Sequence, residues 1–394
     1  MLANIPDEIL LKIFSKLTTK QLLLNVALVN KQFYRISKDP SLMKVVILEN
    51  IDSYVYESVE ILLKNITMIQ TLTIKESVMK KEHLLSIALQ TSKVLKTVII
   101  KNQFCQNLAK VLLEHGQNIE NLDLSNSFRD AKYDEIIFPS NMTRLKSIKF
   151  CDLDESLNSK HIKSMALNCK YLKEVGLPKI ESFSDELMDE FCNSLENMET
   201  LSFRASDELK WKFNGLASNG KLKELKVKLT SYSVLDSTQV SNICKIPNLK
   251  VFCLEWDLQG ETVLIDMFSN FKMDNLEKLW VEIPCKFAPL NIFKVIINRL
   301  GSKLKILGLT CPVYCKRVNC PNTTNLNIED VKSILKKSPD LEHLGINVKN
   351  LPEQFLCEIK YKHKTKISVD QHKYKSMRRF QTFNPKFFEN MLYL

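Results

Sequence analysis

A three-position apolar motif recurs along most of this chain of 394 residues. The motif is L-x-x-L-x-L, with other aliphatic residues or Phe allowed in place of Leu, and each copy reads as one short strand. The first positions of successive copies lie 24–28 residues apart, except for a last step of 37 residues. A period this regular predicts a repeat architecture, in which each unit buries its apolar side chains against its neighbours. The copies begin at Leu42, Ile69, Leu95, Ile119, Leu145, Leu172, Met198, Leu222, Leu249, Leu276, Leu304 and Leu341.

Apolar residues at helical spacing lie between the motifs, for example Ile162, Met165 and Ala166. Each unit is therefore predicted to be one strand followed by one helix. The pattern resembles the leucine-rich-repeat family, in its longer, ribonuclease-inhibitor-like form, over about residues 42–350. The resemblance implies an α/β fold. This fold is a right-handed solenoid of about 12 repeats, bent like a horseshoe with its strands inside the curve and its helices outside.

Enzymatic chemistry finds little support in the composition. Only 8 residues are Gly, and no G-x-G-x-x-G motif is present. The segment most similar to a phosphate-binding loop runs from Gly215 to Lys221, but Leu222 follows where such a loop has Ser or Thr. The 6 His residues have no nucleophile or carboxylate at a useful spacing. We therefore predict a protein that is not an enzyme, without catalytic residues, cofactor or metal ion.

The 11 cysteines are odd in number and scattered, and a chain of this length does not need disulfides for stability. We expect reduced thiols, and so a location in the cytoplasm and/or the nucleus. The long last step of the period marks an insertion near residues 310–325, which contains Cys311, Cys315 and Cys320. No fourth ligand is evident nearby, so we expect free thiols there rather than a zinc site. No apolar run approaches the ~18 residues of a membrane span.

Residues 4–43 do not follow the repeat and predict three short helices. Thr18 and Gln21 have the spacing of a capping box for the second helix, which carries apolar residues as far as Leu28. Asn30 can cap the third helix. Three short helices have more apolar surface here than they can bury among themselves. They therefore either cap the repeats or present an apolar stripe to a partner.

The same block resembles an F-box, whose pattern is Leu-Pro-x-Glu-Leu/Ile-Leu-x-x-Ile-Phe-x-x-Leu, then Val-Cys-x-x-Trp/Phe and Asp-x-x-Leu-Trp. The matching strings are Ile5-Pro6-Asp7-Glu8-Ile9-Leu10, Ile13-Phe14, Leu17, Val29-Asn30-Lys31-Gln32-Phe33 and Asp39-Pro40-Ser41-Leu42. The resemblance implies binding to a Skp adaptor, which bridges to a cullin scaffold and the ubiquitin-transfer machinery. Carried over position by position, it implies that the residues on or under the adaptor-binding surface are Ile5, Pro6, Ile9, Leu10, Ile13, Leu17, Val29 and Phe33.

The residue between the second and third apolar positions of each strand points to the concave face, because neighbouring residues of a strand alternate in direction. One group on this face combines an aromatic residue with both signs of charge, which is typical of protein-binding hot spots. We interpret this group as a target-binding surface, made of Arg204, Lys226, Lys228, Glu255, Trp280 and Glu282. The alternative interpretation is that the basic residues are merely solvated and that the C-terminal tail covers Trp280.

Basic residues concentrate at the C-terminal end. The chain has a net charge of +11, from 56 Lys and Arg against 45 Asp and Glu, and residues 358–394 supply +6 of it, as 9 basic minus 3 acidic residues. Lys364, Ile367 and Val369 have the spacing of one further strand. We expect the remaining mixture of basic and aromatic residues to seal the end of the leucine spine. The alternative is binding to nucleic acid or to an anionic membrane, which we disfavour.

Three domains are predicted: an F-box at residues 1–45, a leucine-rich-repeat solenoid at 46–358, and a basic, aromatic C-terminal cap or tail at 359–394. As a member of the F-box and leucine-rich-repeat class, the chain is expected to be a substrate receptor. It would hold a Skp adaptor and cullin scaffold at one end and an unknown target protein on its concave face, and be monomeric apart from that complex. The alternative is an interaction scaffold or inhibitor that uses the repeats without a ligase.

Overall fold

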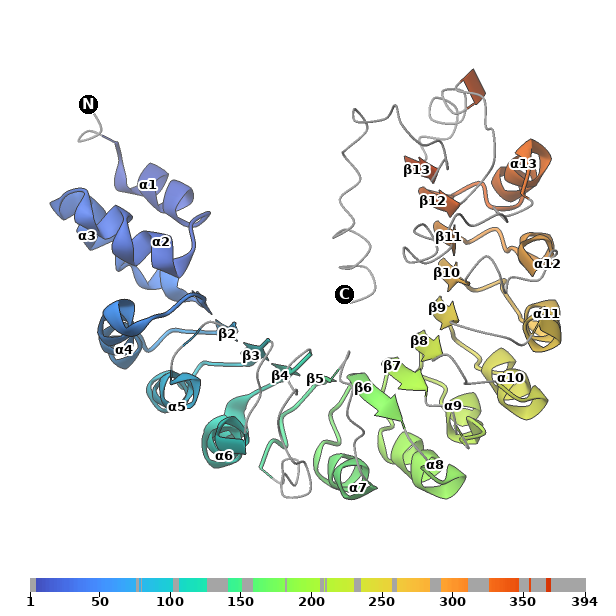
Figure 1. Ribbon diagram of the computed structural model, residues 1–394, viewed down its shortest axis with the longest axis horizontal. Helices are drawn as coiled ribbons and strands as arrows, with labels where there is room; N and C mark the ends of the chain where they lie inside the picture. The colour runs from blue at the N-terminus through green and yellow to red at the C-terminus, as the bar shows by residue number, and fades with distance from the viewer. Residues whose placement is uncertain are drawn as a thin grey trace. The chain divides into compact units, whose positions relative to one another are not determined.

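The computed structural model describes most of the chain (Figure 1). The chain divides into two compact units, Met1–Lys179 and Ile180–Leu394. The predicted insertion after residue 310, with its three cysteines, and the predicted tail apart from 366–369 lie outside the described residues. The described residues are 5–75, 78, 80–101, 106–125, 141–150, 159–180, 183–205, 209, 211–229, 235–256, 261–283, 292–310, 326–346, 354–355 and 366–369.

The first unit begins with a small group of helices, as the sequence predicts. Their bounds are α1 (Asp7–Phe14), α2 (Thr19–Leu24), the 3₁₀-helix η2 (Val26–Leu28), α3 (Lys31–Ser37) and the 3₁₀-helix η3 (Pro40–Met43). Thr18 and Gln21 form the predicted capping box, and the Asn30 side chain accepts a hydrogen bond from the Phe33 N–H at 2.8 Å. The second predicted helix is shorter than expected, because its helical turn tightens to a 3₁₀-helix after Leu24.

Strand–helix repeats form the rest of the first unit. All its strands are parallel and are hydrogen-bonded in chain order. The helices between them lie on one side of the sheet (Figure 1). The strands are β1 (Val45–Leu48), β2 (Thr71–Ile74), β3 (Thr97–Ile100), β4 (Asn121–Asp123), β5 (Ser147–Lys149) and β6 (Glu174–Ile180). The helices are α4 (Ser53–Asn65), α5 (Lys81–Thr91), α6 (Gln106–His115), η4 (Gly116–Asn118) and α7 (Ser159–Asn168).

The second unit continues the same alternation, which confirms the predicted leucine-rich-repeat fold. Its helices are α8 (Asp185–Ser194), α9 (Asn214–Ser218), α10 (Ser237–Cys244), α11 (Glu261–Asn270), α12 (Ile292–Arg299) and α13 (Ile328–Lys337). Its strands are β7 (Thr200–Ala205), β8 (Glu224–Leu229), β9 (Val251–Trp256), β10 (Lys278–Glu282), β11 (Ile306–Thr310), β12 (His343–Ile346) and β13 (Lys366–Val369). The predicted further strand exists, since β13 pairs in parallel with β12 and extends the sheet into the predicted tail.

The first repeat corrects the sequence analysis by one residue. The predicted apolar copy at Leu42, Val45 and Ile47 is wrong. β1 aligns Val46 with the buried Leu72 of β2, and Val46 is fully buried whereas Val45 is exposed. Leu42 instead packs against the core of the N-terminal helices. The core positions of this repeat are Met43, Val46 and Leu48.

A carbonyl group just before most of the described strands accepts two hydrogen bonds from the next repeat. The Lys96 carbonyl, for example, accepts from the N–H groups of Glu120 at 2.8 Å and Asn121 at 2.9 Å. The same arrangement recurs from Lys44 in the first unit to Lys305 in the second. These bonds hold neighbouring strands in register, so that the apolar positions of one repeat meet those of the next.

The N-terminal helices pack directly on the first repeat. Leu10 and Phe33 share one buried core with Leu62 of α4. The outer edge of β1 is also contacted, because the Ile47 N–H donates to the Thr19 hydroxyl at 3.3 Å. The helices therefore cap the apolar spine and the open strand edge of the first unit.

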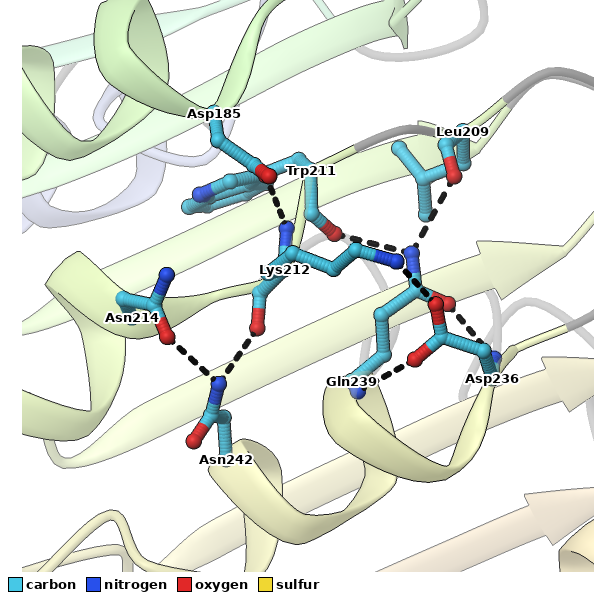
Figure 2. Close-up of polar contacts among 8 residues, drawn as sticks. All are labelled: Asp185, Leu209, Trp211, Lys212, Asn214, Asp236, Gln239 and Asn242. Atoms are coloured by element: carbon cyan, nitrogen blue, oxygen red, sulfur yellow. Dashed lines mark hydrogen bonds and ion pairs between the residues drawn. The ribbon is translucent and has the colours of Figure 1, made fainter.

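One repeat of the second unit replaces most of its helix with an extended segment. Its helix α9 is short, and Trp211, which precedes it, is completely buried. The Lys212 N–H donates to the Asp185 carboxylate, and the Lys212 ammonium group pairs with Asp236 (Figure 2). These contacts tie the segment to the helices of both neighbouring repeats, α8 and α10.

Side-chain amides of α10 hold the same segment (Figure 2). The buried Gln239 amide donates to the carbonyl groups of Leu209 at 3.1 Å and Trp211 at 2.8 Å. The Asn242 amide donates to the Lys212 carbonyl at 2.7 Å. These bonds satisfy backbone groups that a regular helix would have paired internally.

We predict that Gln239→Met lowers the free energy of unfolding by about 2–3 kcal/mol, because it keeps the side-chain volume but leaves two buried carbonyl groups without donors. The measurement is urea unfolding followed by circular dichroism. The matched control is Gln90→Met on α5, where the amide is exposed and the change should stay within about 0.5 kcal/mol. Equal effects of the two substitutions would contradict the role of Gln239.

Candidate functional site

Helix α1 has one buried and one exposed apolar face. Leu10 and Phe14 lie in the core of the N-terminal helices, whereas the Ile9 side chain is exposed and Ile13 is 49% exposed. Residues four apart lie on the same face of a helix. Ile9 and Ile13 therefore form a short, half-exposed apolar stripe on the surface of α1.

The elements that follow α1 expose further apolar side chains. Leu28, at the end of η2, is 79% exposed, the adjacent Val29 is also exposed, and so is Tyr34 on α3. Helix α3 contacts both α1 and η2. Apolar surface concentrated in one small group of packed helices is typical of a protein-binding site.

Polar contacts brace α1 against α3. Asp7 accepts a hydrogen bond from the Gln32 amide at 2.9 Å and forms an ion pair with Arg35 at 2.5 Å. Gln32 also donates to the Ile5 carbonyl at 3.1 Å. The bonds from Gln32 and Arg35 hold the pKa of the Asp7 carboxyl below its ordinary value. The relative position of the two helices is therefore set before any partner arrives.

The predicted adaptor-binding residues lie at different depths. Leu10 and Phe33 are buried, and the Phe33 ring packs edge-on against Phe14 with 5.1 Å between ring centroids. These two side chains can support a binding surface only from beneath. Ile5 and Leu17 are half-buried at the margin of the core. The exposed members of the set are Pro6, Ile9, Ile13 and Val29.

Sequence reasoning did not single out Leu28 and Tyr34 as surface residues. Leu28 was expected on a continuous second helix, but the 3₁₀-helix η2 ends there and leaves its side chain exposed. Tyr34 follows the buried Phe33, so it points away from the core, and the Lys38 ammonium group lies 4.0 Å from its ring centroid. The helical spacing of the apolar residues Phe33 and Ile36, which leaves Tyr34 off their face, was the signal that could have identified Tyr34.

The six predicted target-binding residues lie on the face of the second unit's sheet that the helices do not cover, on four neighbouring strands. Backbone pairing aligns Arg204 with Lys228, Lys228 with Glu255, and Glu255 with Glu282. A second row lies two residues earlier in each strand. This row contains Ser202, Lys226, Cys253, Trp280, Gly308 and Gly345.

The indole ring of Trp280 lies over two glycines of its own row. A Cβ atom added to Gly308 would come within 2.0 Å of the ring Cε3, and one added to Gly345 would be 3.3 Å from Cη2. Glycine weakens a strand unless something must approach the backbone closely. Here the two glycines leave the space that the half-buried ring fills along the sheet.

Carboxylates accompany the lysines of this face. The Lys226 ammonium group lies 2.8 Å from Glu224, and the Lys228 ammonium group lies 2.8 Å from Glu255. The face is therefore mixed in charge around Trp280. A partner has to complement both signs of charge as well as the aromatic ring.

Within the described ranges, no group of three or more His, Cys, Asp or Glu side chains could hold a metal ion, and no helix is long and apolar enough to cross a membrane. The described cysteines carry no disulfide. Burial raises the pKa of Cys169 to about 12 and that of Cys253 to about 12. Both thiols therefore stay protonated at neutral pH and are poor nucleophiles.

The N-terminal helices match a known family. Residues 2–49 match the family model described as F-box-like. These helices are an F-box-like domain. No curated protein matches the chain by sequence.

Solved structures resemble the chain beyond this F-box-like domain. A chain from the crystal structure of the Rad7 and Elc1 complex in yeast is 14% identical, with 89% of this chain and 85% of that chain covered and a TM-score of 0.52. The leucine-rich repeat-containing protein LegL7 from Legionella pneumophila is 13% identical, with 72% of this chain and 95% of that chain covered and a TM-score of 0.41. The first likeness shows a shared fold. The chain thus combines an F-box-like domain with leucine-rich repeats.

We predict that Gly308→Ala lowers the free energy of unfolding by about 1–3 kcal/mol, because the added methyl group would overlap the Trp280 ring. Gly220→Ala is the control, since a Cβ atom there meets no atom within 4 Å and should change stability by less than about 0.5 kcal/mol. Both free energies are measured by urea unfolding. A Gly308→Ala variant as stable as the control variant would show that the ring does not cover this glycine.

Proposed function

We propose that this protein is the substrate-recognition subunit of a Skp–cullin–F-box ubiquitin ligase. The F-box-like domain binds the Skp adaptor, and the helix-free face of the repeats binds a target protein. The observation that carries this proposal is the exposed apolar surface of Ile9, Ile13, Leu28 and Val29 on a domain that matches the F-box-like family. Large apolar side chains on a rigid group of helices lose contact with water when a partner covers them.

Further support comes from the N-terminal helices and from a similar solved structure. The N-terminal helices have their own buried core, so the exposed side chains are not needed to stabilise the domain. The similar yeast structure is a complex of Rad7 and Elc1, which is consistent with an assembly role for this fold.

Such an assembly works in a compartment where thiols stay reduced, and we propose the cytoplasm, the nucleus or both.

The subunit performs no chemistry in this proposal. It holds the target at a fixed place relative to the ubiquitin-transfer machinery, and the gain is a high effective concentration of ubiquitin donor near target lysines. Proteins with an F-box and leucine-rich repeats are typically non-catalytic adaptors or scaffolds. The second candidate function is an interaction scaffold that uses the repeats alone, and adaptor binding distinguishes the two.

We predict that Ile13→Asp weakens binding of the Skp adaptor about tenfold or more, because the interface would bury an unpaired carboxylate. The fold should survive, since the side chain is half-exposed. The measurement is co-purification with the co-expressed adaptor, followed by titration calorimetry of the purified variant. Leu167→Asp on α7, where the leucine is exposed far from the F-box-like domain in sequence, is the control and should bind normally. Retained adaptor binding by Ile13→Asp would favour the scaffold.

We predict that Trp280→Ala removes target proteins from the set labelled by a proximity-labelling enzyme fused to the chain, while adaptor labelling is unchanged. Loss of the ring opens a gap over the two glycines and removes the aromatic anchor of the face. Ile13→Asp should give the opposite result, with the adaptor lost and the targets kept. If Trp280→Ala leaves the labelled set intact, the target binds elsewhere.

A further inference from the structure

A basic groove lies at the edge of the second unit where the strands begin. Four lysines line it, Lys221, Lys223, Lys250 and Lys303, together with two carboxylates, Glu199 and Glu277. Four positive and two negative charges leave a net charge of +2 on these lining side chains. The groove therefore has an excess of positive charge, although Lys223 and Lys250 each have a carboxylate partner.

The backbone fixes the order of these charges. The N–H groups of Lys223, Lys250 and Glu277 donate to the carbonyl groups of Glu199, Lys223 and Lys250, at 2.8, 2.7 and 2.8 Å. The Lys305 N–H continues the series with a bond to the Glu277 carbonyl group at 2.8 Å, so from Glu199 to Lys305 the row reads negative, positive, positive, negative, positive. Adjacent parallel strands lie ~4.8 Å apart. Lys221 lies two residues before Lys223, outside this row, and adds a further lysine to the groove.

The lysines are held in place and remain accessible. The Lys223 ammonium group lies 2.6 Å from Glu199, and the Lys250 ammonium group lies 3.0 Å from Glu277. Their side chains are still 50% and 53% exposed. Lys221 donates to the Asn197 side chain at 2.8 Å. Each ammonium group has three N–H donors, so a lysine held by one partner can bind an incoming anion without first being ordered.

The groove has room for a ligand beside Gly220. This residue is exposed, and a Cβ atom added to it would meet no atom within 4 Å. The hydrogen bonds from Lys250, and then Lys305, hold the pKa of Glu277 below its ordinary value, so this carboxylate stays charged. The groove is thus open, and its lysines outnumber the two carboxylates that lie among them.

We propose that this groove binds a short acidic segment of a protein partner, with the acidic side chains seated on Lys221, Lys223 and Lys250. The site goes beyond the proposed target surface, because it lies at the strand-start edge and not on the helix-free face. A nucleic acid fits less well, since its continuous phosphate backbone would run against Glu199 and Glu277. The lining side chains also include no aromatic ring on which a base could stack.

The test uses the purified full chain and a fluorescein-labelled peptide that carries Glu-Asp-Glu between neutral ends. Fluorescence anisotropy measures the affinity. The neutral Gln-Asn-Gln peptide should not bind, and a phosphoserine version shows whether carboxylate or phosphate is the better anion. The triple variant K221Q/K223Q/K250Q should bind about tenfold more weakly, since each exposed charge pair contributes little alone. Adaptor co-purification should not change, which separates this test from the proposed ligase function.

Two further variants keep the test independent of misfolding. E199Q/E277Q removes the two carboxylates of the groove and should strengthen peptide binding about threefold, a gain that a damaged fold cannot produce. Gly220→Leu keeps every charge but fills the open space beside Gly220, and should weaken binding. The control is K96Q/K146Q in the first unit, where two lysines with 59% and 53% exposed side chains share Glu120, and it should bind like the wild type.

Several results would overturn the proposal. One is equal binding of the neutral peptide, and another is an unchanged or lower affinity in E199Q/E277Q. An equal loss in K96Q/K146Q would show that any basic patch suffices. Tighter binding of a single-stranded oligonucleotide than of the acidic peptide, lost in the triple variant, would make the groove a nucleic-acid site instead.

Discussion

The paired hydrogen bonds at the start of most described strands are the constraint on which the other features depend. One carbonyl group accepts two N–H groups from the next repeat, and a slip of one residue would break both bonds and turn the apolar side chains out of the core. With the register set in this way, every second strand residue is buried and the residues between them form rows on the helix-free face. The same bonds line up the lysines and glutamates that precede the strands.

The period of the apolar motif predicted most strands and helices because the buried positions are aliphatic in nearly every repeat. It misplaced the first repeat, since residues 42–48 are apolar except for Lys44 and allow two registers. Contact of Leu42 with the N-terminal helices decides between them. The short α9 was also not predictable. The Gln239 and Asn242 amides bond to backbone carbonyl groups before it, and since every residue has such a carbonyl group, the sequence does not mark the acceptors.

The sequence could propose residues for the candidate surfaces, but it could not tell which of them are buried and which are exposed. The F-box pattern names Leu10 beside Ile9, yet the packing of the N-terminal helices with one another and with α4 makes the first a core residue and leaves the second exposed. On the sheet, the alternating direction of strand side chains was enough to place Trp280 and Gly308 in one row. The sequence could not show that the ring lies over Gly308, because this depends on the rotamer of Trp280. The ion pair of Lys228 with Glu255 joins two successive strands, β8 and β9, and it too depends on the side-chain rotamers.

The hydrogen bond from the Ile47 N–H to Thr19 has a consequence for how the repeats can be studied alone. A fragment that starts after the N-terminal helices would leave the β1 edge open and uncover the part of Leu62 that those helices bury. Open edges of parallel sheets recruit other strands, so such a fragment would tend to self-associate. The N-terminal helices and the first repeat are thus one folding entity, and the helices that carry the exposed apolar residues also keep the edge of β1 from pairing with another chain.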